Sequence, residues 1–368
     1  MIPLFKPFMP ETVLEPLAKT LLSGWIGEGP RVREFEAALA QRLGVAVEQI
    51  VTVNSGTSSL QLALRLANVG PGDEVISTAM TCAATNEPIV LAGARIRWAD
   101  IDPLTGNISA SSIAGAITGK TKAIMIVHWG GYPCDLQAIN EIAAAHGIPV
   151  IEDAAHALGS EYHGSLIGTH SAFACFSFQA IKTITTVDGG LLVCRNTEDA
   201  ERGRRLRWFG IDRNARKSEV FWEYDIDEAG YKFHMNDVTA TIGLEQLKYL
   251  DDLLAFQRRN AAIYYAELQN VPGLTLPPHR DDRLSSYWLM TMLVDERDRF
   301  VKMLKASGIA SSVVHIRNDR YAVFKDAIQA GSLPGLDAFT ERMICIPVGY
   351  WVTPDDALRI ATAIKQGW

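Results

Sequence analysis

A lysine, an aspartate and a glycine-threonine turn are the residues of this sequence whose types and spacing could together do chemistry. Lys182 ends an apolar, aromatic run that begins at Ala172. Burial disfavours the ammonium form of a lysine, so its pKa falls and the amine becomes a usable nucleophile. Taken alone, however, the segment favours a core strand whose lysine extends its charge to the surface. The other two features reverse that preference.

Asp153 follows a second apolar run, Ile148–Ile151. A carboxylate directly after a buried strand is costly unless a cation or a strong donor meets it. The pyridinium N–H of pyridoxal phosphate is such a donor, and the cofactor's role as an electron sink requires that nitrogen to stay protonated. Glu152 should point to the opposite side of the pleat. His156 would either flank the cofactor or fill a polar gap.

A phosphate-binding turn is predicted at Ser55–Ser58, between a β-branched run and an Ala/Leu-rich helical pattern. Gly56 would let the backbone approach a ligand, and the start of the helix offers free N–H groups and a positive dipole end to an anion. Thr57 and Ser58 add hydroxyl donors. By itself the motif is more typical of an ordinary N-cap. No Rossmann G-x-G-x-x-G motif is present, which weakens a nicotinamide interpretation.

The elements that would position these residues alternate along the first two-thirds of the chain. Helical patterns such as Ser58–Ala67 and Leu136–His146 separate short apolar runs. This alternation predicts an α/β fold with a mostly parallel sheet covered by helices on both faces. Ligands of such sheets collect beyond the carboxyl ends of the strands. The predicted strands are Ile50–Val53, Glu74–Ser77, Arg95–Trp98, Ala123–Val127, Pro149–Glu152, Ala172–Phe178 and Leu191–Cys194.

The pattern changes after Gly243, where the sequence predicts one long helix over Leu244–Gln269. We expect a large domain with an N-terminal arm over residues 1–248 and a smaller α+β domain over residues 249–368. In the smaller domain, sequence after Pro272 is strand-like, and three further elements are predicted: a helix over Asp295–Ser307, a strand over Ser311–His315 and a helix over Pro354–Lys365.

Composition excludes several classes of protein. The net charge of −7 argues against a general nucleic-acid binder, which needs an excess of cations. No apolar run approaches the length of a membrane span, and the N-terminus lacks the pattern of a signal peptide. Five scattered cysteines predict reduced thiols in a cytoplasmic protein. His156, His163 and His170 recur every seven residues, but intervening glycines break any helix that would align them, so no metal site is expected.

As a combination, these residues resemble the DegT/DnrJ/EryC1/StrS family of sugar aminotransferases, which use pyridoxal phosphate. The resemblance runs over nearly the whole chain and implies an aspartate aminotransferase-like fold (PLP fold type I), with a large mixed, mostly parallel sheet domain and a smaller C-terminal α+β domain. The motifs that carry it are Gly24–Pro30, Asn54–Thr57, Ala99–Asp102, His128–Pro133, Glu152–His156, Phe176–Phe178, Lys182, Gly189–Gly190 and Ile242–Leu247.

The resemblance assigns a role to each matching position. It implies that Lys182 forms the Schiff base with the cofactor and moves the proton, and that Asp153 binds the pyridine nitrogen. His156 occupies a family position near the phenolic oxygen of the ring. Phosphate contacts are implied for Gly56, Thr57, Ser58 and Ser177. A lysine rather than a histidine at position 182 favours transamination over the dehydration carried out by related proteins.

Two positions depart from the family pattern. Cys82 stands where the family usually stacks an aromatic side chain on the cofactor ring, and a thiol would cover the ring with less area. Lys232 stands in place of an asparagine that reaches the phosphate in a neighbouring subunit. We expect Lys232 to replace that contact with a charged one, in a homodimer with shared active sites; the alternative is that it points to solvent.

The substrate is indicated less directly. Arginines between Arg202 and Lys217, interleaved with Trp208 and Phe209, would hold the diphosphate of a nucleotide-sugar, although a solvated helical face is the better interpretation for most of them. Substrate contacts are expected for Trp25, His315 and Arg317.

The expected reaction moves an amino group from an amino acid, L-glutamate, to a nucleotide-linked 4-keto-6-deoxyhexose. The alternatives are a cyclitol or other unlinked ketone as the acceptor, and a non-catalytic sensor that keeps the fold.

Overall fold

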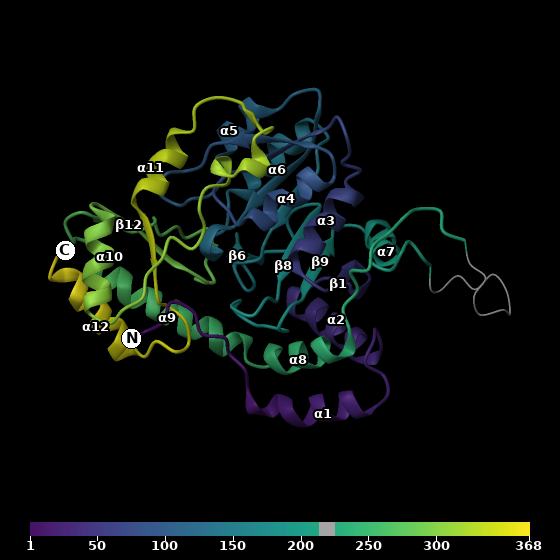
Figure 1. Ribbon diagram of the computed structural model, residues 1–368, viewed down its shortest axis with the longest axis horizontal. Coiled ribbons are helices and arrows are strands. Elements are labelled where there is room, and N and C mark those ends of the chain that lie inside the picture. The colour runs from purple at the N-terminus through teal and green to yellow at the C-terminus, as the bar shows by residue number, and fades with distance from the viewer. Residues whose placement is uncertain (213–224) are drawn as a thin grey trace.

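An eight-stranded sheet forms the centre of the computed structural model, which describes residues 1–212 and 225–368 (Figure 1). The strand order is β1-β9-β8-β5-β4-β2-β3-β13. Only β9 runs antiparallel to its neighbours, so the sheet is mixed and mostly parallel, as predicted. The strands are β1 Ile50–Val53, β2 Glu74–Thr78, β3 Arg95–Ala99, β4 Thr121–Val127, β5 Val150–Asp153, β8 Phe173–Ser177, β9 Gly190–Cys194 and β13 Ile328–Gln329.

Helices cover both faces of this sheet because alternate residues of each strand point to opposite sides. In β4, Ala123 and Met125 join one apolar cluster, whereas Ile124 and Ile126 join the other. One face is covered by α3 Gly56–Leu66, α4 Ala83–Leu91 and α7 Thr197–Leu206. The other is covered by α2 Pro30–Leu43, α5 Ala110–Ala116, α6 Leu136–Ala145 and α8 Asp237–Leu247. All seven predicted strands are therefore confirmed, with ends that differ by up to two residues.

The C-terminal part has its own apolar core around a three-stranded sheet, β10 Leu274–Thr275, β12 Met290–Val294 and β14 Met343–Ile346. Its helices are α9 Leu250–Leu268, α10 Arg297–Ala306, α11 Pro334–Arg342 and α12 Pro354–Lys365. A third small sheet joins β11 Arg283–Leu284 to β6 Glu161–Tyr162 and β7 Ser165–Leu166. Because β13 pairs with β3 of the large sheet, the two parts interlock, and the boundary at residue 248 stays a prediction.

The N-terminal arm lies across both parts before the chain enters α1 Leu14–Leu22 (Figure 1). Ile2 pairs with Ile309, and the indole N–H of Trp351 donates to the Pro3 carbonyl. Short 3-10 helices complete the elements: Glu11–Val13, Val47–Gln49, Trp129–Gly131, Asn318–Arg320 and Ala322–Phe324. In the part of the chain that the structure describes, no helix combines the length and apolar character needed to cross a membrane.

Two sequence predictions are wrong. The single helix over 244–269 is two helices, since Tyr249 leaves helical geometry with ψ of 1° and packs its ring against Phe8 of the arm. The strand over 311–315 is reduced to one bridge between Ser312 and Cys345. It stops because Val314 has a φ of +61°, a left-handed conformation that a β-branched residue adopts only under strain.

Candidate active site

Lys182 lies in the loop that follows β8, not at the end of the strand itself. The loop folds back with a hydrogen bond from the Lys182 N–H to the Gln179 carbonyl. The side chain is partly buried, and its Nζ sits 3.8 Å from the ring centroid of Trp288. Burial lowers the pKa of Lys182 to about 8, while the charges of Asp153 and Cys82 act in the opposite direction. The amine is therefore present in both protonation states near neutral pH.

Asp153 is the last residue of β5 and is buried. The Thr85 hydroxyl donates to its Oδ2 over 2.7 Å, and the Ala155 N–H donates to its Oδ1 over 3.1 Å. Burial raises the pKa of Asp153, and these two donors together with the Lys182 charge offset only part of that effect. A cationic ring N–H would complete the compensation of this carboxylate.

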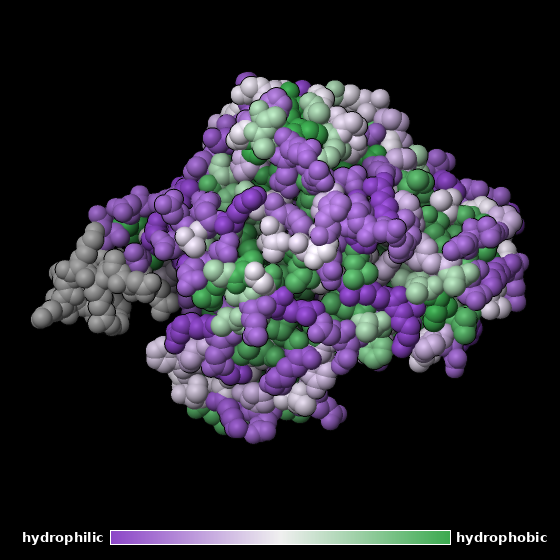
Figure 2. All heavy atoms as spheres, turned by 180° about the vertical axis from the view of Figure 1, so that it is seen from behind, coloured by the Kyte–Doolittle hydropathy of each residue, from purple (hydrophilic) through white to green (hydrophobic). Residues whose placement is uncertain are grey.

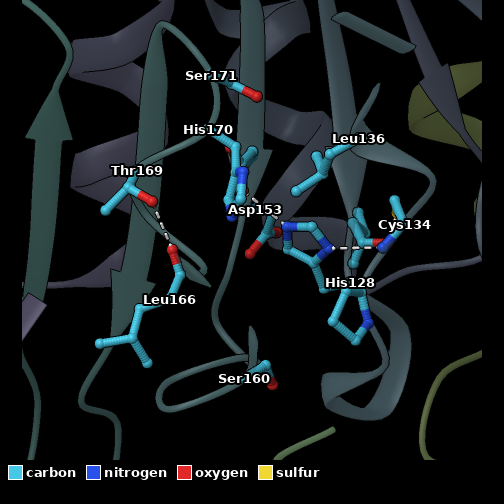
Figure 3. A network of polar contacts seen from close by, with 12 residues as sticks. His128, Cys134, Leu136, Asp153, Ser160, Leu166, Thr169, His170 and Ser171 are labelled. Atoms are coloured by element: carbon cyan, nitrogen blue, oxygen red, sulfur yellow. Dashed lines mark hydrogen bonds and ion pairs between the residues drawn. The ribbon is translucent and has the colours of Figure 1, made fainter. Parts of the chain in front are cut away.

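Glu152 points to the opposite side of the sheet, as the pleat predicts. It is fully buried, and its Oε2 lies 2.9 Å from Nε2 of His128. Nδ1 of His128 accepts a hydrogen bond from the Cys134 N–H over 3.1 Å, the dashed contact to the right of Asp153 in Figure 3. An accepting Nδ1 means that Nε2 carries the proton of a neutral ring and donates it to Glu152. This pair anchors the strand that delivers Asp153.

The turn before α3 combines a helix N-cap with the predicted phosphate-binding residues. Ser55 caps the helix by accepting the Ser58 N–H over 3.0 Å, and the Ser58 hydroxyl donates to Asn54. The N-cap interpretation therefore holds with Ser55 as the cap, and the Ser58 hydroxyl is already engaged by Asn54. A side chain at Gly56 would place its Cβ 2.8 Å from that of Ser177, so glycine is required where β8 ends against the turn.

Two histidines and a thiol complete the surroundings of Lys182. Cys82 precedes α4 and is partly buried. The ring of His156 stacks on Trp288 at 3.9 Å between centroids, and its Nδ1 accepts the Gly130 N–H. His315 stacks parallel to His156 at 5.9 Å. Burial and the Lys182 charge lower the pKa of both rings, that of His315 to about 4, so both are neutral at pH 7.

Three predicted residues are placed elsewhere. The Arg317 guanidinium is buried and committed to ion pairs with Asp319 and Asp337, so the structure does not direct it toward Lys182. Trp25 is 58% exposed, on the rim of a pocket of about 620 Å³. Lys232 is exposed, with its Nζ 4.5 Å from the ring centroid of Trp208.

Most of the described arginines in the basic segment, which starts at Arg202, bind other groups within the protein. Arg207 is buried and pairs with Glu28 and Glu36, whereas Arg202 pairs with Glu228. Arg204 donates to the carbonyls of residues 48 and 50. Arg205 helps to line the pocket beside Trp25, and the last three members of the predicted diphosphate site, Arg213, Arg216 and Lys217, lie outside the described residues.

Sequence reasoning missed two residues that contact this site. The Thr85 hydroxyl donates to the carboxylate of Asp153, and its only signal in the sequence is its place three residues after Cys82. Trp288 contacts both Lys182 and His156, from a part of the chain more than 100 residues away. No local pattern marks it, because the contacts depend on how the C-terminal part packs against the large sheet.

Comparisons with known proteins identify the family and the fold. The sequence profile of the DegT/DnrJ/EryC1/StrS aminotransferase family matches residues 8–365. Among curated proteins, the dTDP-4-dehydro-2,3,6-trideoxy-D-glucose 4-aminotransferase of Saccharopolyspora spinosa is 34% identical over 356 residues, covering 95% of this chain and 92% of the relative.

Solved structures show the same fold. The sugar aminotransferase CalS13 from Micromonospora echinospora has a TM-score of 0.95 and 39% identity, with 100% of both chains covered. Spr1654 from Streptococcus pneumoniae, solved in its PMP form, has a TM-score of 0.91 and 30% identity, covering 100% of this chain and 98% of its own. A PLP form of the same protein also matches.

Proposed function

This chain belongs to the DegT/DnrJ/EryC1/StrS aminotransferase family, and from that premise we propose that it transfers the amino group of L-glutamate to a nucleotide-linked 4-keto-6-deoxyhexose. It is an aminotransferase of a family that depends on pyridoxal phosphate. One observation carries the proposal: the amine of Lys182 interacts with the charge of Asp153, and burial lowers its pKa to about 8. Membership of a family of aminotransferases argues against the alternative of a non-catalytic sensor.

The residues present fit the cofactor. The carboxylate of Asp153 is buried with only partial compensation, which suits a protonated ring nitrogen. The absence of a Cβ at Gly56 lets Ser177 lie close to the start of α3, and the start of a helix favours a phosphate. Thr57 is the next residue of the same turn. When bound, pyridoxal phosphate supplies an electron sink and carries the amino group between the two substrates.

The protein's own residues move the proton and exclude water. Lys182, with its pKa near 8, can take a proton from the carbon of the bound amino acid and return it at low cost. Asp153 would hold the charge of the ring nitrogen, and because the carboxylate is buried this interaction would be stronger than in water. Neutral His156 offers a donor or an acceptor without adding a competing positive charge.

The choice of acceptor rests on the relatives. The Saccharopolyspora spinosa relative is named for the amination of a dTDP-linked 4-keto sugar. Guanidinium groups for a diphosphate are available in the pocket of about 620 Å³, which Trp25, Arg33 and Arg205 help to line. We propose that this pocket holds the nucleotide diphosphate.

A second candidate acceptor is a cyclitol or other unlinked ketone. The observation that favours it is the commitment of Arg317, Arg202 and Arg207 to ion pairs within the protein. Fewer free guanidinium groups remain for a diphosphate than the sequence suggested.

We further propose a homodimer with shared sites. Helix α1 carries exposed Leu14, Leu21 and Leu22, and Trp25 and Ile26 continue the same apolar surface. A few green spheres show at the lower edge of the molecule, among mostly white and purple ones (Figure 2). Exposed apolar groups in this number are typical of an interface. Lys232 would then reach the phosphate in the partner's site.

The proposal is tested with purified holoenzyme and half-reactions. L-glutamate should convert the cofactor's visible absorbance to the PMP spectrum, and a dTDP-linked 4-keto-6-deoxyhexose should reverse it. Lys182→Ala should abolish both changes. Reversal by a free inosose, and not by any nucleotide-linked sugar, would favour the cyclitol alternative. Full turnover by Lys182→Ala would refute the role of this lysine.

Shared sites are tested by mixing two inactive variants. Refolded mixtures of Lys182→Ala and Lys232→Ala should regain activity, because one of the two sites in each mixed dimer receives both native residues. Monomeric behaviour in light scattering, together with full activity, would refute the arrangement.

A further inference from the structure

Trp288 connects the reactive amine to two other segments of the chain. It is 5% exposed, and it follows a loop that leads into β12. Its ring centroid lies 3.8 Å from Nζ of Lys182, 3.9 Å from the ring of His156 and 5.3 Å from that of Phe5. Its indole N–H donates to the carbonyl of Ile181 over 2.8 Å. The same side chain therefore contacts both the main chain and the amine at the lysine position.

These two contacts act on different parts of Lys182. The indole hydrogen bond fixes the peptide that precedes the lysine, so it limits how far the loop after β8 can turn. The ring face attracts the ammonium group, and among aromatic side chains tryptophan does this most strongly. Any buried tryptophan needs a partner for its N–H, so the amine above the ring is the contact that filling the core does not require.

We propose that Trp288 is the positioning residue of Lys182: its indole N–H holds the backbone at Ile181, and its ring face holds the ammonium form of the lysine beside Asp153. The inference rests on the proposed function only in that Lys182 is taken as the reactive amine. The contacts themselves belong to the protein without any substrate.

The charge state of Lys182 then reflects a balance among the groups that face it. Burial disfavours the ammonium. The charges of Asp153 and Cys82 favour it, and the Trp288 ring adds to them. His156 and His315 also lie within range of the Lys182 charge, but both are neutral at pH 7 because burial and that same charge depress their pKa values. Weakening the ring's attraction should therefore lower the pKa of Lys182.

Fluorinated tryptophans at position 288 test the effect of the ring on the pKa of Lys182 without changing the shape of the side chain. Each fluorine on the indole weakens the negative potential of the ring face and leaves the N–H in place. We would insert the series at position 288 by amber suppression and measure the pKa of Lys182 in the apoprotein, from the pH dependence of trace acetylation read by peptide mass spectrometry. A cation–π contact of ordinary strength predicts a total fall in the pKa of about 0.4–1.5 across the series. A pKa that stays constant within about 0.2 across the series overturns the ring's role.

The hydrogen bond is tested with a matched pair of variants. Trp288→Phe keeps a ring and loses the N–H bond to Ile181, whereas Trp368→Phe loses a like bond, from its indole N–H to the Asp295 carbonyl over 2.7 Å, far from the site. Trp288→Phe should lower the rate of the glutamate half-reaction at least fivefold while the KM for glutamate changes less than twofold. Trp368→Phe should leave both within twofold. Equal effects of the two variants overturn the positioning role of the N–H.

The outcomes separate this inference from the proposed function. Loss of all cofactor chemistry in Lys182→Ala tests the reactive amine, whereas the acetylation series reports on Trp288 in a protein without cofactor or substrate. If Lys182→Ala is inactive and the pKa of Lys182 does not change with fluorination, the proposed function is supported and the role of the Trp288 ring is refuted. Circular dichroism and the Tm of each variant show whether it is folded, and the fluorinated proteins keep the native side-chain shape where Trp288→Phe does not.

Discussion

Replacing Thr85 by valine tests whether Asp153 depends on a buried hydroxyl. The hydroxyl donates to Asp153 Oδ2 over 2.7 Å, and both side chains are buried. Valine keeps the shape and removes the donor. A hydrogen bond to a charged group contributes about 1.5–3 kcal/mol, so Thr85→Val should lower the free energy of unfolding of the apoprotein by that amount where the carboxylate is ionised.

The pKa of Asp153 sets the pH dependence of this loss. Burial raises that pKa above its ordinary value of 3.8, and the Thr85 hydrogen bond lowers it. An acid whose folded-state pKa is raised stabilises the fold most below its unfolded pKa, and that contribution is lost as the pH rises through the folded pKa. Removing the hydroxyl raises the pKa further. The difference between Thr85→Val and wild type should therefore be largest near pH 8 and shrink as the pH falls toward 3.8.

The assay is urea denaturation of the apoprotein near pH 8 and near pH 5, with two controls. Thr81 is also buried, and its hydroxyl lies 2.6 Å from that of Thr85, so Thr81→Val removes a neighbouring hydroxyl without touching the carboxylate. Asp153→Asn supplies the background for a double-mutant cycle. The reasoning fails if Thr85→Val costs no more than Thr81→Val at both pH values, or if its cost is unchanged in Asp153→Asn.

Three further outcomes are expected. Lys182→Met should make the apoprotein more resistant to urea at pH 7, because a lysine whose folded pKa is lowered to about 8 destabilises the fold below that pH; the advantage should fade as the pH rises from 8 toward 10.5. Gly56→Ala should weaken cofactor binding at least tenfold in an absorbance titration, whereas Gly115→Ala, which meets nothing within 4 Å, should not. Arg207→Met should cost about 3–5 kcal/mol in urea melts by leaving Glu36 buried without its cation, and adding Glu36→Gln should recover part of that loss.

The strands and the direction of the side chains along them could be predicted from the local sequence pattern. The seven strands came from β-branched and apolar runs between helical segments, and the register of the pleat correctly separated Glu152 from Asp153. Gly56 was singled out for its permissive backbone, and the structure adds the reason: β8 approaches so closely that a Cβ would collide with Ser177. The strands and the pleat depend on residues close in sequence, whereas the requirement for glycine at position 56 comes from β8, which is distant in the sequence.

The errors arise where distant segments override the local pattern. Leu244–Gln269 has the periodicity of one helix, but Phe8 of the arm packs on Tyr249 and the helix breaks there. Val314 sits in a valine-rich run that favours a strand, yet it adopts a φ of +61°. That turn ends the strand just before His315, which stacks against His156. A functional site is where such local conflict is expected, because positioning there outweighs propensity.

Some properties of Lys182 could be predicted from the sequence, whereas others depend on tertiary packing. The apolar run predicted a lowered pKa through burial, and burial is indeed the largest cause. The predicted strand ends at Phe178 and β8 ends at Ser177, so the lysine is carried by the loop that follows rather than by the strand. A loop cannot fix an amine by itself, and its position must come from contacts made elsewhere. Trp288 makes two of them, from beyond the predicted boundary at residue 248. The reactivity of this lysine is therefore a property of how the C-terminal part packs on the large sheet, and variants at that contact should change the pKa of Lys182 without altering the residues that would hold the cofactor.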